Sequence, residues 1–186
     1  RFFDNDYFDN KPGQSSVAIL DKLTVRQGAI LQTTHAGNHV NSIYGGQLTS
    51  GLNNTDGTSA DLILHDWNPL SALKISSAIV NNTASGRIVN LVKAGDGTTA
   101  LAGSNTYTGS TYLQGGVLRL DSAGALPGNS HVRLDGGVLG LNNGDFARTL
   151  GAGSSQVDWT SSGGFAAYGS DRTVTLGGGT TLTWGT

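Results

Sequence analysis

Cysteine, methionine and glutamate are absent from this chain of 186 residues, and charged side chains make up only 13% of it. Without cysteine the chain has no disulfide framework, no thiolate metal site and no thiol nucleophile. The net charge of -2 leaves no basic footprint for nucleic acid. No apolar run approaches the roughly 18 residues that a membrane-spanning helix needs.

The two ends of the chain lack the marks of a complete gene product. It starts at Arg1 without an initiating methionine, and its first residues do not have the charged-then-apolar layout of a signal peptide. The last residues, 181–186, resemble an interrupted strand. We therefore expect a processed chain or an internal fragment.

The chain is instead rich in glycine, with 29 residues, and in asparagine, threonine and serine, which solvate turns and strand faces without charge. Almost no window escapes glycine, paired asparagines or β-branched residues, so helical periodicity is missing. Short strands bounded by Gly, Asn or Asp are predicted throughout. Their ranges are 16–20, 29–32, 61–65, 73–80, 87–92, 111–113, 117–120, 132–134, 138–141, 156–159, 173–176 and 181–184.

Internal repetition is the strongest signal in the chain. The Gly-Gly-Val-Leu run at 115–118 returns at 136–139, and the run 132–139 is echoed at 174–181, at twice that shift. The shorter shift corresponds to a coil of about 21 residues, which holds three short strands and three turns. The repetition predicts an all-β fold, a parallel β-helix or solenoid with one repeat per rung.

The same register assigns places to particular side chains. The inward candidates are Leu118, Leu120, Leu139 and Leu141. Paired glycines fit corners, where φ can be positive; they are Gly45-Gly46, Gly115-Gly116, Gly136-Gly137 and Gly178-Gly179. We expect Asn81-Asn82 and Asn142-Asn143 at bends, with their amides stacked on those of neighbouring rungs. Residues 1–41 repeat less clearly and are expected to form irregular rungs or a cap, with the β-helix at 42–186.

The stretch from Lys93 to Leu120 carries a family pattern. It reads Lys-x-Gly-x-Gly-Thr-x-x-Leu-x-Gly-x-Asn-Thr-Tyr-Thr-Gly-x-Thr, then a strand, a glycine and Leu-x-Leu. From about Ser42 onward the chain resembles the autotransporter-associated β-strand repeat proteins, although Thr99 and Tyr112 depart from the usual residues. Segments 162–169 and 182–185 are similar to those that follow the repeat in long members. The resemblance implies a right-handed β-helix, export, an extracellular or outer-membrane-associated location, and no catalytic residues.

Two groups of side chains suggest metal binding. Asp4, Asp6 and Asp9 bring oxygen ligands suited to Ca²⁺, but their spacing is not that of an EF-hand. The alternative is a solvated acidic turn whose neighbouring phenylalanines cover the end of the solenoid. His35 and His39 would share one face of a helix and bind zinc, yet the Ala-Gly-Asn between them favours a loop.

Other polar and aromatic residues raise the question of glycan chemistry. Asp56, Asp61, Asp66 and Asp96 supply carboxylates for a glycosidase or lyase, or else they cap turns. His65 and His131 read as outward strand positions. Five aromatic residues either form a platform on which sugars stack or pack over corners and neighbouring rungs. These residues are Trp67, Trp159, Trp184, Tyr112 and Tyr168.

Taken together, the residues predict no catalytic, cofactor-binding or metal site. We expect a non-catalytic stalk, scaffold or adhesive segment of a bacterial surface protein, whose open ends suit end-to-end assembly into filaments. The alternative is a glycan-binding or polysaccharide-cleaving module on the same fold. Expected partners are neighbouring segments or copies of the same protein and cell-surface glycans, with no nucleic acid and no membrane span.

Overall fold

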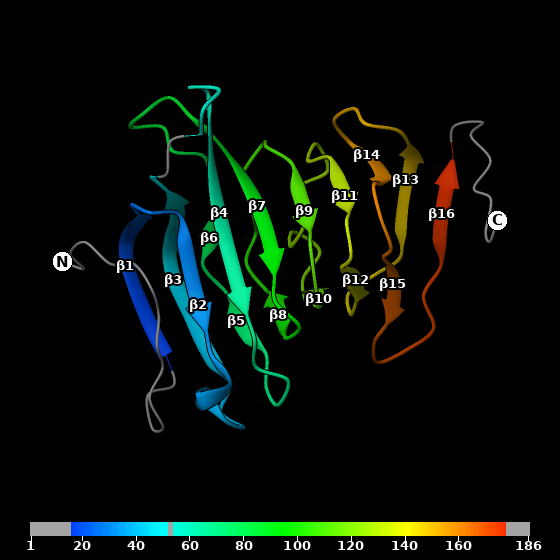
Figure 1. Ribbon diagram of the computed structural model, residues 1–186, viewed down its shortest axis with the longest axis horizontal. Coiled ribbons are helices and arrows are strands. Elements are labelled where there is room, and N and C mark those ends of the chain that lie inside the picture. Colours follow the sequence, from blue (N-terminus) through cyan, green and yellow to red (C-terminus); the bar gives the residue numbers. More distant parts are fainter. Residues whose placement is uncertain (1–15, 52–53, 178–186) are drawn as a thin grey trace.

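The computed structural model describes residues 16–51 and 54–177. It holds two sheets of eight strands each, and every strand pairing in them is parallel. In Figure 1 the strands follow one another along the long axis of the molecule, from β1 to β16. The predicted parallel β-solenoid is confirmed.

The first sheet, sheet A, runs in the order β1, β3, β5, β8, β10, β12, β15, and β6 pairs with β3 beside β5. Most of its strands are short because each forms one side of a coil and then turns away, whereas β1 and β3 have ten residues each. Their bounds are β1 Ser16–Val25, β3 Asn41–Ser50, β5 Leu73–Ile75, β6 Ala78–Ile79, β8 Thr98–Leu101, β10 Val117–Leu120, β12 Val138–Leu141 and β15 Gly164–Ala167.

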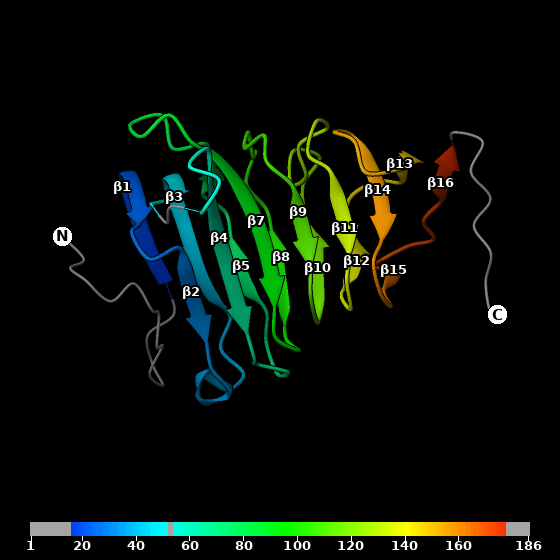
Figure 2. The same cartoon turned by 45° about the horizontal axis from the view of Figure 1, so that its top comes forward.

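The second sheet, sheet B, runs in the order β2, β4, β7, β9, β11, β14, β13, β16. Figure 2 shows strands of the two sheets lying one behind the other along the stack. The bounds in sheet B are β2 Ala29–Gln32, β4 Ser59–Asp66, β7 Ile88–Ala94, β9 Thr111–Leu113, β11 Val132–Leu134, β13 Phe146–Leu150, β14 Gln156–Trp159 and β16 Val174–Gly177.

Three short strands per rung, as predicted, occur in the coil that contains β4, β5 and β6, whereas the coils from β7 to β12 have two strands each. The third side of the repeat is the extended connection 102–110. Its residues alternate between buried and less buried, as a strand's would, and inward-facing Asn105 and Tyr107 lie on it. Single backbone hydrogen bonds join this connection to its neighbours, such as Asn105 N to Gly124 O (2.9 Å). These scattered bonds do not make a ladder.

The predicted rung length is confirmed in the middle of the chain, where Val117 pairs with Val138 and Thr111 with Val132. The repeat of the run 132–139 at 174–181 does not set the strand pairing beyond β12. Val132 pairs with Val157, and Val174 pairs with Phe146 on β13, which lies beyond β14. The turn 151–155 brings the start of β14 back beside the end of β13. The coil that contains β13 and β14 is therefore longer than the regular rung, and β16 is the third strand after β11 in sheet B.

The core lies between the two sheets. The four predicted inward leucines Leu118, Leu120, Leu139 and Leu141 are all buried there. Leu118 stacks on Leu139 and Leu120 on Leu141 in neighbouring strands, which forms the expected aliphatic ladder. Burial of such side chains is the main force that holds the two sheets together.

Two of the predicted glycine corners are confirmed, between β9 and β10 and between β11 and β12. Gly116 has φ +58°, and a Cβ there would lie 2.3 Å from Gly97 O of the rung below. The Gly45-Gly46 pair lies within β3, opposite a bulge between Ile19 and Lys22 of β1. Both glycines have the predicted positive φ, and β3 pairs with β5 before them and with β6 after them. The strand bends there and continues. Gly178-Gly179 lies outside the described residues.

The asparagine pairs lie at bends, but their amides do not stack on one another. Asn81 accepts hydrogen bonds from Val89 N (2.9 Å) and Thr108 N (3.1 Å), and Asn142 donates to Asp121 Oδ1 (3.0 Å). The stacking prediction is therefore wrong. Backbone donors and a carboxylate within reach are better partners for these amides than another amide.

Four strands were not predicted from the sequence: β3, β8, β13 and β15. The predicted strand 181–184 lies outside the described residues. The division at residues 41 and 42 stays a prediction, and β1 and β2, which precede it, pair in parallel with β3 and β4. Among the described residues no helix is long and apolar enough to span a membrane.

Candidate functional site

A polar groove of ≈ 600 Å³ lies on the outer face of sheet B. Its floor consists of outward side chains from three neighbouring strands, β4, β7 and β9, and the turn 54–58 forms its rim. The strand register sets the floor, because Asp61 pairs with Asn90 and Val92 with Tyr112. The lining residues are Asn54, Thr55, Asp56, Ser59, Asp61, Asn90, Val92, Tyr112 and Gln114.

Asp56 fixes the rim of the groove. Its Oδ1 accepts hydrogen bonds from Thr58 N and Ser59 N, both 2.8 Å long, and its Oδ2 accepts one from Ser59 Oγ at 2.6 Å. These bonds, that from the Ser59 hydroxyl foremost, lower the pKa of Asp56 to about 2. Asp56 therefore stays ionised, and it holds the turn in shape as an N-terminal capping carboxylate does.

Asp61 lies at the centre of the floor. Its Oδ1 accepts hydrogen bonds from Asn54 Nδ2 (2.7 Å) and Asn90 Nδ2 (2.8 Å), which tie the rim to two strands. Among the described residues, no hydrogen bond occupies Asp61 Oδ2, the Gln114 amide or the Tyr112 hydroxyl. Three sets of polar atoms thus face the groove without a protein partner.

The Tyr112 ring closes the floor on the side of β11. It is half-buried, and the guanidinium of Arg133 lies 6.0 Å from its centroid. Arg133 in turn donates two hydrogen bonds to Asp158, at 3.2 and 3.0 Å. The positive charge beside the ring is therefore already paired, and the bidentate geometry holds the guanidinium in place.

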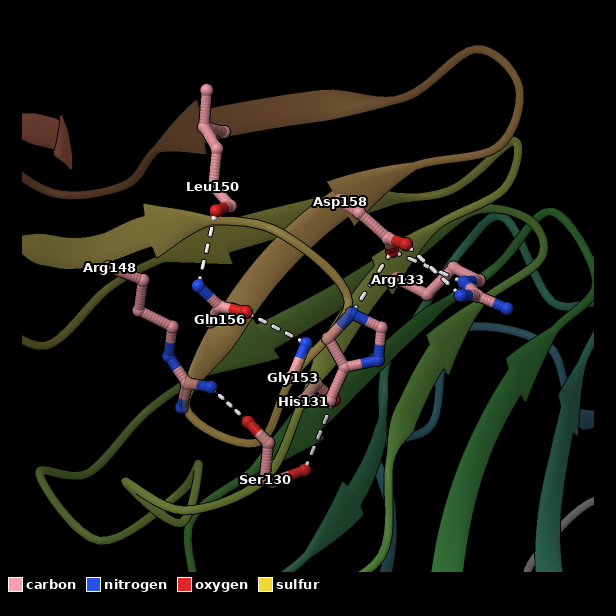
Figure 3. A network of polar contacts seen from close by, with 8 residues as sticks. All are labelled: Ser130, His131, Arg133, Arg148, Leu150, Gly153, Gln156 and Asp158. Carbon is pink, nitrogen blue, oxygen red and sulfur yellow. Dashed lines mark hydrogen bonds and ion pairs between the residues drawn. The ribbon is translucent and has the colours of Figure 1, made fainter. Parts of the chain in front are cut away.

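Figure 3 shows this pair together with His131 and Arg148, near the loop that joins β13 to β14. His131 lies on the outer side of sheet B, as predicted, where it contacts the same Asp158 that binds the outward Arg133, but its side chain is buried there. Its Nε2 lies 3.1 Å from Asp158 Oδ1, an ion-pair distance when the imidazole is protonated, although the geometry is not that of a hydrogen bond. Arg148 donates to the carbonyl oxygens of Ser130 and Pro127. The network joins the irregular coil to the regular repeat.

The structure brings Asp56 and Asp61 to one groove but leaves the other two candidate carboxylates elsewhere. Asp66 has no exposed surface and accepts hydrogen bonds from Asn68 N (3.0 Å), Leu73 N (3.3 Å) and Thr99 Oγ1 (3.3 Å). Burial raises its pKa, against these bonds. Asp96 is exposed at the corner between β7 and β8. Neither carboxylate lines the groove.

Lys93 is a second buried charge at the same corner. Its Nζ donates to the carbonyl oxygens of Ala94 (2.8 Å), Gly95 (2.7 Å) and Gly115 (3.2 Å) and so joins two successive corners. Burial lowers its pKa to about 8, although Asp66 and Asp96 act in the opposite direction. The lysine and glycines of the family pattern therefore build a corner.

The histidines show no metal site in the described part of the chain. His35 lies in a single 3-10 turn, η1 Thr34–Ala36, and His39 follows in the loop; both are exposed. His65 lies on β4 and faces away from the core, as predicted. Nowhere in 16–51 or 54–177 do three or more His, Asp or Glu side chains converge. Asp4, Asp6 and Asp9 lie outside the described residues, so calcium binding there stays a prediction.

The five aromatic side chains do not form one platform. Trp67 follows β4 and is exposed, whereas Trp159 packs edge-on against Phe165, with 6.0 Å between ring centroids. Tyr168 belongs to the sheet A side, where Arg119 lies 5.6 Å from its ring centroid. Trp184 lies outside the described residues. Tyr112 is the one among them that lines the groove.

Three amide side chains of the groove were missed from the sequence: Asn54, Asn90 and Gln114. Asn90 follows Asp61 on the next strand of sheet B and joins it only through the pairing of β4 with β7. The coil between these two residues is longer than the regular rung, so no periodic signal in the sequence connects them.

The fold and its glycine corners define a parallel β-solenoid repeat protein with a polar groove on the outer face of sheet B. The passenger-associated transport repeat family matches residues 91–120. The chain is 34% identical over 128 residues to the adhesin BmaC autotransporter of Brucella suis biovar 1 (strain 1330). That match covers 67% of this chain and 4% of the relative. No solved structure matches.

The chain therefore belongs to the autotransporter passenger repeat proteins, as the motif at 93–120 indicated. The matched repeat covers the first part of the segment 91–141, in which the coils have nearly equal length.

Proposed function

We propose that this chain is a non-catalytic stalk and scaffold segment of a passenger, which holds adhesive regions away from the bacterial outer membrane. The observation that carries the proposal is the unbroken parallel pairing from β1 to β15 in one sheet and from β2 to β16 in the other. Each strand bonds to the coil before and the coil after, so length grows with every rung while the cross-section stays the same.

The carboxylates support a role without catalysis. A glycosidase needs an accessible acid whose pKa is raised, next to a second carboxylate. Hydrogen bonds lower the pKa of Asp56 in the groove. Asp66 lies outside the groove, and although burial raises its pKa, it has no exposed surface. Neither carboxylate is suited to be the general acid.

Replacement of this segment in a displayed passenger tests the stalk role. We expect an unrelated β-solenoid with the same number of rungs to preserve both adhesion to host cells and the distance of a terminal epitope from the cell. Deletion of the segment is expected to shorten that distance and to leave export intact. Loss of adhesion in the length-matched replacement would show that this segment itself carries the adhesive surface.

End-to-end assembly of copies is a second candidate function. Among the described residues, β1 and β2 at one end and β15 and β16 at the other have a hydrogen-bonded neighbour on one side only. Such edges recruit other strands. Light scattering over a concentration series, with negative-stain imaging, is expected to show filaments that grow by end addition; a monomer at all concentrations would exclude this role.

A further inference from the structure

The groove on sheet B combines the two kinds of group that hold sugars in proteins. The Tyr112 ring offers an apolar face, and Asp61 Oδ2 and the Gln114 amide offer an acceptor and donors beside it. A pyranose ring has the matching surfaces, because its C–H groups lie on one face and its hydroxyls point outward along the edge. We propose that this groove binds an uncharged glycan chain.

The charge of the groove selects against acidic sugars. The described residues that line it include two aspartates and no lysine or arginine. The hydrogen bonds that lower the pKa of Asp56 keep that carboxylate ionised at neutral pH. Arg133, the cation nearest to Tyr112, is paired with Asp158. A uronic acid or sialic acid would therefore meet negative charge that no lysine or arginine of the groove lining offsets.

The dimensions of the groove suit a short stretch of chain. It crosses β4, β7 and β9, which at about 4.8 Å per strand spans roughly 10 Å, enough for two linked sugar rings. Its volume of ≈ 600 Å³ falls within the range of small-molecule sites. Hydrogen bonds from the side-chain amides of Asn54 and Asn90 hold the Asp61 carboxylate in place before any ligand binds, so the acceptor is preorganised.

The first test uses an array of neutral hexasaccharides of glucose, mannose, galactose and N-acetylglucosamine beside uronic-acid hexamers, followed by calorimetry on the best binder. The test variant is Tyr112→Ala, and the matched control is Tyr44→Ala, an exposed tyrosine on β3 in the other sheet. We expect a neutral glycan to bind, Tyr112→Ala to weaken it roughly tenfold, and Tyr44→Ala to leave it unchanged.

A second pair of variants tests the polar side of the groove. Asp61→Asn removes the charged acceptor and keeps the shape, and Asp171→Asn is the control at an exposed carboxylate elsewhere. Asp61→Asn is expected to weaken glycan binding about tenfold without a matching fall in melting temperature. Preference for uronic acids, unchanged affinity in Tyr112→Ala, or no neutral binder at millimolar concentration would overturn the proposal. None of these outcomes affects the stalk role, which is tested by length-matched replacement.

Discussion

Lys93 is a charged side chain with no exposed surface, held by three carbonyl oxygens at the corner between β7 and β8. Its amine joins the corner of its own rung to Gly115 in the next. The opposed effects of burial and of Asp66 and Asp96 leave its pKa at about 8, below the ordinary value of 10.5. Protonation of one residue is thereby linked to the stability of the repeat.

This linkage predicts that stability rises with pH over a defined window. Below about pH 8 Lys93 is protonated in both states, and between about pH 8 and 10.5 the unfolded chain alone retains the proton. Unfolding free energy is therefore expected to increase by about 2 kcal/mol from roughly pH 7.5 to roughly pH 9.5. Urea titrations at both pH values measure it.

Lys93→Met is the control for that pH dependence. It removes the titrating group but leaves the carbonyls of Gly95 and Gly115 without their donor, so we expect a loss of roughly 1–3 kcal/mol at neutral pH. The increase between the two pH values should disappear in this variant. An equal increase in both proteins would mean that another group titrates.

Alanine substitution at three glycines distinguishes the energetic cost of backbone strain from the cost of close atomic contact. Gly116 has φ +58° and an added Cβ would lie 2.3 Å from Gly97 O; Gly144 has φ +80° with open space around it; Gly128 has open space and no positive φ. Alanine is expected to cost about 3 kcal/mol at Gly116, about 1 kcal/mol at Gly144 and close to nothing at Gly128. Thermal melts of the three variants rank them, and equal losses at Gly116 and Gly144 would contradict the contact term.

At the scale of elements, Asn105 joins three successive coils. Its Oδ1 accepts from Ile79 N (2.8 Å) and its Nδ2 donates to Ala125 O (2.6 Å), and both bonds are buried. The asparagine replaces ladder hydrogen bonds where the extended connection 102–110 has none of its own. These two hydrogen bonds are the structural reason for the asparagine of the family pattern.

Asn105→Ala is expected to lower the unfolding free energy by about 2–3 kcal/mol, because it leaves a buried N–H and a buried carbonyl without partners. Hydrogen exchange should increase first at Ile79 and in the turn around Ala125. Asn129→Ala, at an exposed position in the following turn, is the matched control and should be near neutral. Uniformly faster exchange along the whole chain would indicate global destabilisation instead of a local bridge.

At the scale of the molecule, the regular register of the middle coils predicts that one rung can be removed. Deletion of residues 117–137 joins Gly116 to Val138 and restores the same Gly-Gly-Val-Leu sequence at the corner. β12 then meets β8 as β10 did, and β9 meets β14. We expect a folded protein whose longest dimension is shorter by about 5 Å.

Small-angle scattering measures the length of that variant, and circular dichroism confirms its strands. The control deletion removes residues 121–130, which connect β10 in sheet A to β11 in sheet B. We expect this half-rung deletion to abolish cooperative folding, because the chain cannot cross between the sheets. Equal behaviour of the two deletions would show that the register does not control folding.

Much of the architecture could be predicted from the sequence, because the repeat carries its own register. In the segment 91–141 coils of nearly equal length follow one another, so glycine corners and inward leucines return at positions that can be counted. Six short strands, β2, β9, β10, β11, β12 and β14, were predicted with the bounds that the structure has. Strands that contain glycine or several polar residues, such as β3 and β15, were missed.

The sequence alone therefore determined the fold class, the repeat length and the family, since each depends on local patterns that recur. Only the tertiary structure decided the groove. Asp61 pairs with Asn90 across a long coil and Val92 with Tyr112 across a shorter one, so two unequal coils must be formed before these side chains meet. Hydrogen bonding between strands sets that register, and turns of unequal length hide it from any count along the chain.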